Sequence, residues 1–158
     1  MLKRIGDRIG PTPWGTNLLR RVIPAGDRVA LRLSRGRHTL TERSMPCLVL
    51  HTIGRRTGQP REQPLVYVRY GDDYAVAGSN WGQAHHPAWS ANLLAHPEAE
   101  IVVDGERHKI AARLVTDEQR AQLWPRFDAI YPGYASYRKR AADRQIRMFI
   151  LSSNGQTA

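Results

Sequence analysis

The sequence has one cysteine, few acidic residues and no long uninterrupted apolar run. A single cysteine, Cys47, excludes an internal disulfide, and its place in an apolar run favours a buried filler over a nucleophile. The longest stretch without Asp, Glu, Lys or Arg, residues 74–97, is interrupted by glycine, asparagine, histidine and proline, so it does not resemble a transmembrane helix. The first 30 residues carry scattered charges and no apolar core, unlike a secretory signal. We expect a cytoplasmic protein, with attachment at the inner face of the membrane left open.

The excess of basic over acidic residues is concentrated near the N-terminus. Of 24 Lys and Arg residues, ten lie in residues 1–45, against three acidic residues there. Apolar residues at helical spacing predict a basic amphipathic segment, which either packs on the domain or lies on an anionic membrane surface. Nucleic acid is disfavoured because no aromatic residues alternate with the basic ones. We interpret residues 1–45 as a helical extension and residues 46–158 as one folded domain.

Residues 47–151 read mainly as strands with two helical insertions. The pattern predicts a hairpin over 47–70, further strands at 74–79, 98–103, 106–115 and 145–151, and helices at 88–95, 116–130 and 134–142. Thr116 with Gln119 fits a capping box. Six strands joined by short, mostly antiparallel connections predict an α+β, mainly β, six-stranded antiparallel barrel with flanking helices. A dinucleotide-binding βαβ fold is disfavoured because no glycine fingerprint follows the first strand.

The turn of the first hairpin, GRRTGQPR at 54–61, is rich in arginine and glycine. Arginine supplies permanent charge and forked donors that suit phosphate or carboxylate, so an anion-binding turn is one interpretation. The simpler one is a solvated basic turn. The phosphate-loop pattern is absent, because no Lys-Ser/Thr pair and helix follow.

Two other stretches carry polar and aromatic residues together. The loop from Ser79 to Pro87 contains two adjacent histidines, but no further ligands at metal-site spacing and no GxSxG around the serine, so metal and serine-hydrolase chemistry are both disfavoured. In YPGYASY, tyrosines recur every three residues, which would place them along one helical face. Core packing is the simplest interpretation. A polar-aromatic wall over a ligand cavity is favoured because three buried phenols each need a partner.

Together these motifs resemble a known family. The runs TIGRRTGQPREQPLVY, AGSNWG, HPAWSANLLAHP and YPGYASY before RQI are similar, in order and spacing, to the actinobacterial deazaflavin-dependent nitroreductases. The resemblance spans about residues 45–151 and implies a split β-barrel, Greek-key-like fold that uses coenzyme F-420 (8-hydroxy-5-deazaflavin).

The resemblance also implies roles for individual residues. It assigns the coenzyme's phosphate and polyglutamate tail to the basic turn, and the ring to the strand and helix ends that follow. The implied cofactor-binding residues are Arg55, Arg56, Thr57, Arg61, Pro64, Leu65, Val66, Ala77, Gly78, Ser79, Asn80, Pro87, Ala88, Trp89 and Asn92. The implied catalytic and substrate contacts are Ser79, Tyr131, Tyr134 and Tyr137. Trp81 stands where relatives often have glycine, so we expect a narrower pocket.

The implied function is hydride transfer from reduced F-420 to a quinone, nitroaromatic or activated enone. The basic N-terminal segment favours a membrane-dissolved quinone such as menaquinone. Two alternatives stay open: an FMN-dependent oxidoreductase of the same fold, and a non-catalytic deazaflavin carrier. The sequence does not decide between a monomer and a homodimer.

Overall fold

The computed structural model describes residue 29 and residues 45–141 and 143–153. The predicted N-terminal extension therefore lies outside the described residues, apart from Val29 and Met45. In chain order the elements are β1 (Cys47–Ile53), β2 (Pro60–Tyr70), β3 (Asp73–Ala77), η2 (Asn80–Gly82), α3 (Ala88–Ala95), β4 (Glu98–Val103), β5 (Glu106–Leu114), α4 (Asp117–Ile130), α5 (Gly133–Ala141) and β6 (Met148–Ser153). None of the helices within these residues is long and apolar enough to cross a membrane.

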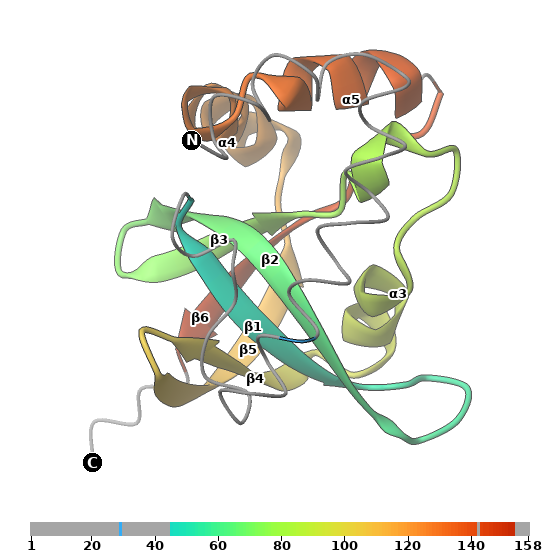
Figure 1. Cartoon of the computed structure of the whole chain (residues 1–158), viewed down its shortest axis with the longest axis vertical. Coiled ribbons are helices and arrows are strands. Elements are labelled where there is room, and N and C mark those ends of the chain that lie inside the picture. The colour runs from blue at the N-terminus through green and yellow to red at the C-terminus, as the bar shows by residue number, and fades with distance from the viewer. Residues whose placement is uncertain (1–28, 30–44, 142, 154–158) are drawn as a thin grey trace.

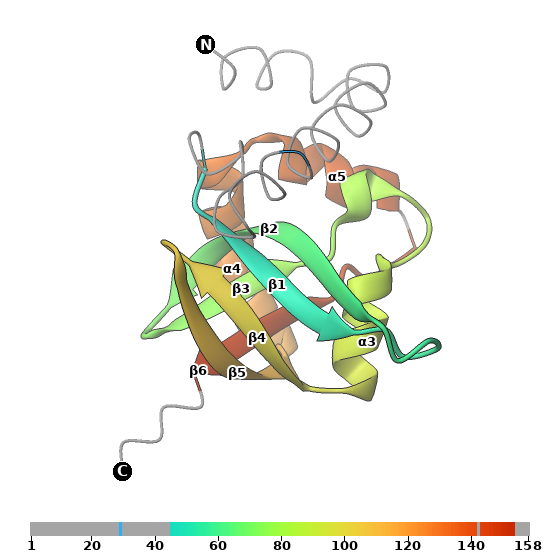
Figure 2. The same cartoon turned by 60° about the horizontal axis from the view of Figure 1, so that its bottom comes forward.

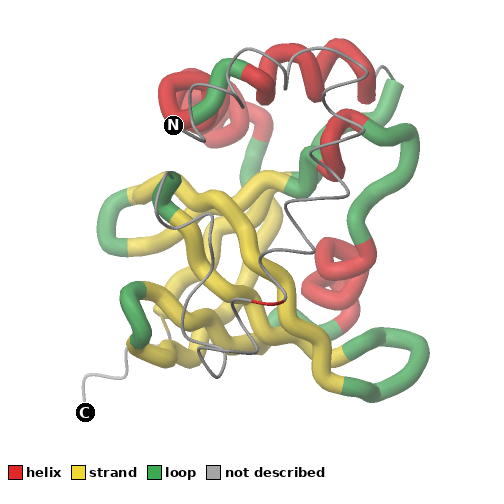
Figure 3. The backbone as a smooth tube through the Cα atoms, in the orientation of Figure 1, coloured by secondary structure: helices red, strands yellow, loops and turns green. Residues whose placement is uncertain are grey.

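The six strands form a closed antiparallel barrel in the order β1-β2-β3-β6-β5-β4, which confirms the predicted fold class (Figure 1). Neighbours along the chain pair as hairpins, with helices inserted only after β3 and β5 (Figure 3). The two-residue turn between β4 and β5 has positive φ at both Asp104 and Gly105, the geometry that matches the twist of the flanking strands.

Alternating residues of each strand point into the barrel and form its core. This interior cluster includes Leu48, Leu50, Ile101, Ile110 and Phe149, all almost fully buried. Helix α3 adds Trp89 and Leu93 to the same cluster, and the Trp89 ring lies 5.8 Å from that of Phe149. The apolar face of α3 is therefore part of the barrel core (Figure 2).

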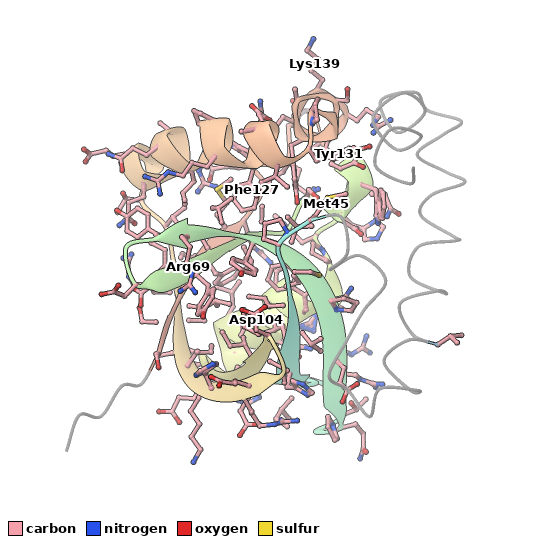
Figure 4. All side chains as sticks on the ribbon, turned by 60° about the vertical axis from the view of Figure 1, so that its left-hand side comes forward. Met45, Arg69, Asp104, Phe127, Tyr131 and Lys139 are labelled. Atoms are coloured by element: carbon pink, nitrogen blue, oxygen red, sulfur yellow. The ribbon has the colours of Figure 1, made fainter. Side chains whose placement is uncertain are left out.

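The outward residues of β3 and β6 form a second core under the other two helices. Ala75, Ala77, Met148 and Ile150 lie in one cluster with side chains of α4 and α5. In Figure 4 the labelled Phe127 lies between helix and barrel. Two apolar layers on opposite faces of the same strands thus fix α4 and α5 to the barrel wall.

Element boundaries follow local chemistry. The capping box is confirmed: Thr116 accepts from the Gln119 backbone N–H at 3.2 Å, and the Gln119 side chain accepts from the Thr116 N–H at 3.1 Å. Strand β3 ends at Ala77, two residues before the predicted end, because the chain turns into η2. Strand β6 begins at Met148 rather than at residue 145, because Arg144 is bonded to the loop before α3.

Candidate functional site

The basic turn between β1 and β2 is compact and held by its own backbone. The Gly54 N–H donates to the Gln59 carbonyl, and the Gly54 carbonyl accepts from the Gly58 N–H, both at 2.8 Å. A Cβ on Gly54 would lie 2.8 Å from the Thr57 hydroxyl, and Gly58 has a φ of +66°, so both positions require glycine. The turn therefore presents its arginines on a defined backbone.

The three arginines of this turn are exposed and carry no carboxylate partner among the described residues. Arg55 and Arg56 make no side-chain hydrogen bond there, and Arg61 donates only to the Thr57 hydroxyl at 3.5 Å. By contrast, Arg138 forms an ion pair with Asp128 at 2.7 Å, which neutralises its charge. The turn is a concentration of positive charge without a counterion among the described residues, which suits an anionic ligand.

Asn92 on α3 fixes the turn to the rest of the molecule. Its side-chain oxygen accepts from the Arg55 backbone N–H at 3.1 Å, and its amide donates to the Thr52 hydroxyl at 3.3 Å. Asn92 and Thr52 are both buried. The predicted cofactor residue Asn92 thus joins the basic turn to α3, two segments almost 40 residues apart in sequence.

The predicted ring-binding strip on β2 lies on an edge of the sheet. Pro64, Leu65 and Val66 pair with β1, while β3 pairs with β2 only from Tyr67 onward. Among the described strands, none pairs with the other edge of residues 60–66. Proline is tolerated on such an edge because no ladder hydrogen bond needs its missing N–H. The half-buried strip Pro64–Val66 therefore offers apolar surface on an edge with which no described strand pairs.

The chain between β3 and α3 passes close to β6. Gly78 N–H donates to the Arg147 carbonyl at 2.8 Å. A Cβ on Gly78 would lie 3.3 Å from both that carbonyl and Pro87 Cγ. Ala88 is exposed and Trp89 is buried in the barrel core, so only the former is at the surface. The predicted Trp89 contact with cofactor is therefore limited to the rim of a largely buried ring.

Residues 79–83 adopt an unusual backbone conformation. Asn80 and Trp81 have φ values of 46° and 57°, and Gly82 follows at 75°. The left-handed region costs a non-glycine residue about 1–2 kcal/mol. Local hydrogen bonds offset this cost. The Asn80 side-chain amide donates to the His85 carbonyl at 3.0 Å, and the Gln83 side-chain amide donates to the backbone and side-chain oxygens of Asn80. The Ser79 hydroxyl has no hydrogen-bond partner among the described residues, so it is available to a ligand.

Arg144 holds this loop from the other side. Its guanidinium donates to the carbonyls of Gln83, Gly78 and Ser79 at 2.9, 3.1 and 2.8 Å. Its Nη1 also lies 3.2 Å from Nδ1 of His86. Burial, together with the charges of Arg147 and Arg144, lowers the pKa of His86. One arginine thus shapes the loop that carries Ser79.

The three predicted tyrosines meet although they do not share one helix. Tyr131 ends α4, and Pro132 separates it from Tyr134 and Tyr137 on α5. The predicted break between the helices at 116–130 and 134–142 is confirmed, so the three tyrosines do not lie along one helical face. The ring of Tyr131 folds back over Gly133, where any Cβ would collide with it. Neighbouring ring centroids lie 5.8–6.1 Å apart.

All three tyrosines are buried, with at most 7% of their surface exposed. They pack in the second core with Phe127, whose ring centroid lies 5.2 Å from that of Tyr134. This packing corresponds to the core interpretation, and a role in acceptor binding stays a prediction. Burial raises the pKa of Tyr134 and Tyr137, and the neighbouring Tyr131 contributes to both shifts. These phenols therefore stay protonated, as hydrogen-bond donors, throughout the physiological pH range.

The structure groups the predicted residues into two regions joined by α3 and the loop before it. Ala77, Gly78, Ser79 and Asn80 lie next to α5, because η2 packs on that helix and the Trp81 ring is 5.9 Å from that of Tyr137. The basic turn lies at the other end of the molecule (Figures 1 and 2). Sequence reasoning did not single out Arg144 or Arg140, because the basic run at 138–147 has no motif that separates ligand-facing from solvent-facing arginines.

Comparisons with known proteins agree with this arrangement. The family model of the F-420H2-dependent quinone reductases matches residues 28–153. An F-420H2-dependent quinone reductase of Mycobacterium tuberculosis is 42% identical over 81 residues, which cover 50% of this chain and 54% of the relative. The matched part thus spans about half the length of the curated relatives. The predicted resemblance to deazaflavin-dependent reductases is confirmed.

Solved structures of related proteins are also similar to this chain. An F-420H2-dependent reductase, FDR-A, superposes with a TM-score of 0.61 and 31% identity, covering 68% of this chain and 94% of that one. A second structure, described as a domain-swapped dimer, has a TM-score of 0.63 and 29% identity and covers 90% of this chain and 99% of its own. The barrel and its helices are shared with both.

Proposed function

Because this chain belongs to the F-420H2-dependent quinone reductase family, we propose that it transfers a hydride from reduced coenzyme F-420 to a quinone. The family name identifies both a deazaflavin coenzyme and a quinone acceptor. The observation that carries the proposal for this chain is the basic turn, where three exposed arginines have no carboxylate partner among the described residues.

The residues present fit the coenzyme. Arg55, Arg56 and Arg61 would hold the phosphate and carboxylates of its tail, with the Thr57 hydroxyl as a further donor. The apolar edge strip Pro64–Val66 would contact the ring, and the free edge of β2 offers backbone groups for the ring's polar atoms.

When bound, the reduced coenzyme supplies two electrons and a proton as hydride. The chain's own contribution is positioning and electrostatic stabilisation of the acceptor. Ser79 and the tyrosines Tyr131, Tyr134 and Tyr137 would donate hydrogen bonds to the acceptor oxygen as negative charge develops on it. The raised pKa of Tyr134 and Tyr137 keeps these donors protonated at neutral pH. Because the rings are packed together, acceptor entry requires a local rearrangement around η2.

The direct test is titration of the purified protein with oxidised F-420 and with FMN side by side. F-420 should bind and FMN should bind much more weakly, and the two are separable by their absorbance. A turnover screen with F-420H2 then compares menaquinone, a soluble naphthoquinone, a nitroaromatic and an enone. Tight F-420 binding with no turnover of any acceptor would indicate the carrier alternative, and preferential FMN binding would overturn the cofactor assignment.

We further propose that the basic N-terminal segment, residues 1–45, brings the protein to an anionic membrane surface at the inner face of the cell membrane, where menaquinone is dissolved. Its net charge of +7 supports this, since each surface cation contributes roughly 1 kcal/mol. Deleting residues 1–40 should reduce binding to anionic vesicles and leave binding to neutral ones unchanged. Equal binding of both forms to both vesicles would argue against it.

The relative described as a domain-swapped dimer also motivates a test of assembly. We propose a homodimer for this chain, with a monomer as the alternative outcome. Sedimentation at several protein concentrations distinguishes the two.

A further inference from the structure

Arg140, on the last turn of α5, carries the least satisfied charge among the described residues. Its Nε and Nη2 are both buried and have no hydrogen-bond partner. None of the ion pairs between described residues includes it, whereas Arg138 on the same helix is paired with Asp128 through two bonds. Leaving buried charged donors unsatisfied is costly, so their presence calls for a ligand that satisfies them.

The position of this guanidinium is set by the strained loop and the tyrosine cluster. Its carbon lies 5.2 Å from the centre of the Tyr137 ring. A Cβ on Gly82 would lie 3.0 Å from Cβ of Arg140, so η2 packs directly on this turn of the helix. The Trp81 ring, held by the left-handed backbone, lies edge-on to the same tyrosine. Arg140 and Trp81 therefore both lie against Tyr137.

We propose that Arg140 binds an oxygen of the electron acceptor and stabilises the negative charge that develops there during reduction. The inference rests on the proposed quinone reductase function and extends it to a residue without an assigned role. A quinone that gains a hydride becomes a hydroquinone monoanion, which then takes one proton from water; the reduced deazaflavin loses the hydride and is oxidised. A guanidinium with buried Nε and Nη2 donors stabilises this oxyanion more than it stabilises the neutral quinone.

The coenzyme tail is the other possible source of an anionic oxygen. It has its own arginines at the basic turn, which Figures 1 and 2 place at the end of the molecule away from α5. One extended coenzyme would place its anionic tail at the turn and its ring near the Ser79 loop. The charge of Arg140 is then left for the acceptor.

The test uses two charge-removing variants of the full chain, Arg140→Met and Lys139→Met. Lys139 is the neighbouring residue, is exposed, and points away from the molecule in Figure 4, so it controls for net charge and helix propensity. Arg140→Met should lower kcat/KM for a soluble naphthoquinone by about 10-fold to 1000-fold, as loss of an oxyanion donor does. Lys139→Met should leave it unchanged. Arg140→Lys keeps the positive charge but lacks the forked guanidinium donors, so it should recover part of the lost kcat/KM.

Two binding measurements separate the possible sources of the anion. The F-420 dissociation constant should be the same in Arg140→Met and wild type; a selective rise would assign Arg140 to the coenzyme and overturn the inference. Thermal stabilisation by 2-hydroxy-1,4-naphthoquinone, an anion at neutral pH, should be lost in Arg140→Met and kept in Lys139→Met. Neutral 1,4-naphthoquinone should stabilise both variants alike.

The outcomes also separate this inference from the proposed function. If wild type reduces no quinone with F-420H2, the proposed function fails, whereas binding of the anionic naphthoquinone still tests Arg140. If wild type turns over and Arg140→Met matches Lys139→Met in kcat/KM and in anion binding, the inference alone fails. Thermal unfolding of each variant checks that it folds, and Arg140→Lys provides the folded comparison if Arg140→Met does not.

Discussion

The basic turn and the tyrosine cluster around α5 are both polar regions, but the turn exposes its polar groups to solvent and the cluster buries them. The turn keeps its charges in water, where exposed arginines cost little and can bind a ligand; no described carboxylate pairs with them. The cluster buries its polar groups: three phenols with at most 7% exposure and a guanidinium with unsatisfied donors. Exposed charge suits affinity for a flexible anionic tail, while buried, oriented donors suit stabilisation of charge that appears only during reaction.

The sharpest way to break this comparison is to remove a buried donor. Tyr137→Phe should lower kcat for quinone reduction by about 10-fold to 1000-fold with little change in F-420 affinity, because the phenol donates only to developing charge. Steady-state kinetics with F-420H2 measure it. An equal loss from Trp124→Phe, a change in the same core outside the site, would assign the effect to packing instead.

Removing an exposed charge should instead weaken F-420 binding and leave kcat unchanged. Arg56→Ala should raise the F-420 dissociation constant about tenfold, the cost of one charge-assisted contact, and should reduce its salt dependence while kcat is retained. Fluorescence titration at several salt concentrations measures both. Lys109→Ala removes the same charge from an exposed position on β5, and a similar rise there would mean that only net charge matters.

The hydrogen bond that joins the basic turn to α3 can be tested by its effect on stability. Asn92→Ala leaves the Arg55 N–H and the buried Thr52 hydroxyl without their partner, which should cost about 1–3 kcal/mol in unfolding free energy. Urea denaturation measures it, with Leu94→Ala, an exposed change on the same helix, as the control. We expect F-420 affinity to fall as well, since the turn loses its anchor; unchanged affinity would show that the turn is positioned by β1 and β2 alone.

The smallest expected effect concerns pH. His86 and His51 both have a lowered pKa, mainly because of burial, with Arg147 and Arg144 near the first and Arg107 near the second. Below the ordinary histidine value of 6.5, the unfolded chain binds protons that the folded chain does not, so stability should fall as pH drops. Unfolding measured from pH 7.5 to 5 should show this decline, and His86→Gln should make it shallower. A parallel decline in the variant would contradict the role of His86.

The parts of this structure that depend on local patterns were predictable from sequence. Alternating apolar residues, turn glycines and the Thr116 capping box gave the strands, hairpins and helix start close to their observed limits. The relative placement of distant groups was not predictable. The bond between Asn92 and the Arg55 backbone spans 37 positions, and Arg144 reaches residues more than 60 positions away. No local pattern distinguishes Arg140 from its neighbours Arg138 and Lys139, because its exceptional feature is the absence of a partner in three dimensions.

Arg144, which donates hydrogen bonds to the Ser79 loop, also determines which ring nitrogen of His86 carries the proton. A guanidinium can only donate, so Nδ1 of His86, 3.2 Å from Nη1, accepts, and the neutral ring carries its hydrogen on Nε2. This tautomer is fixed by a cation that never titrates, and the lowered pKa keeps a second proton off the ring. A neutral imidazole N–H is a very weak acid, so His86 is a poor proton source at neutral pH. In the proposed reduction of a quinone, we therefore expect the completing proton to come from solvent rather than from His86.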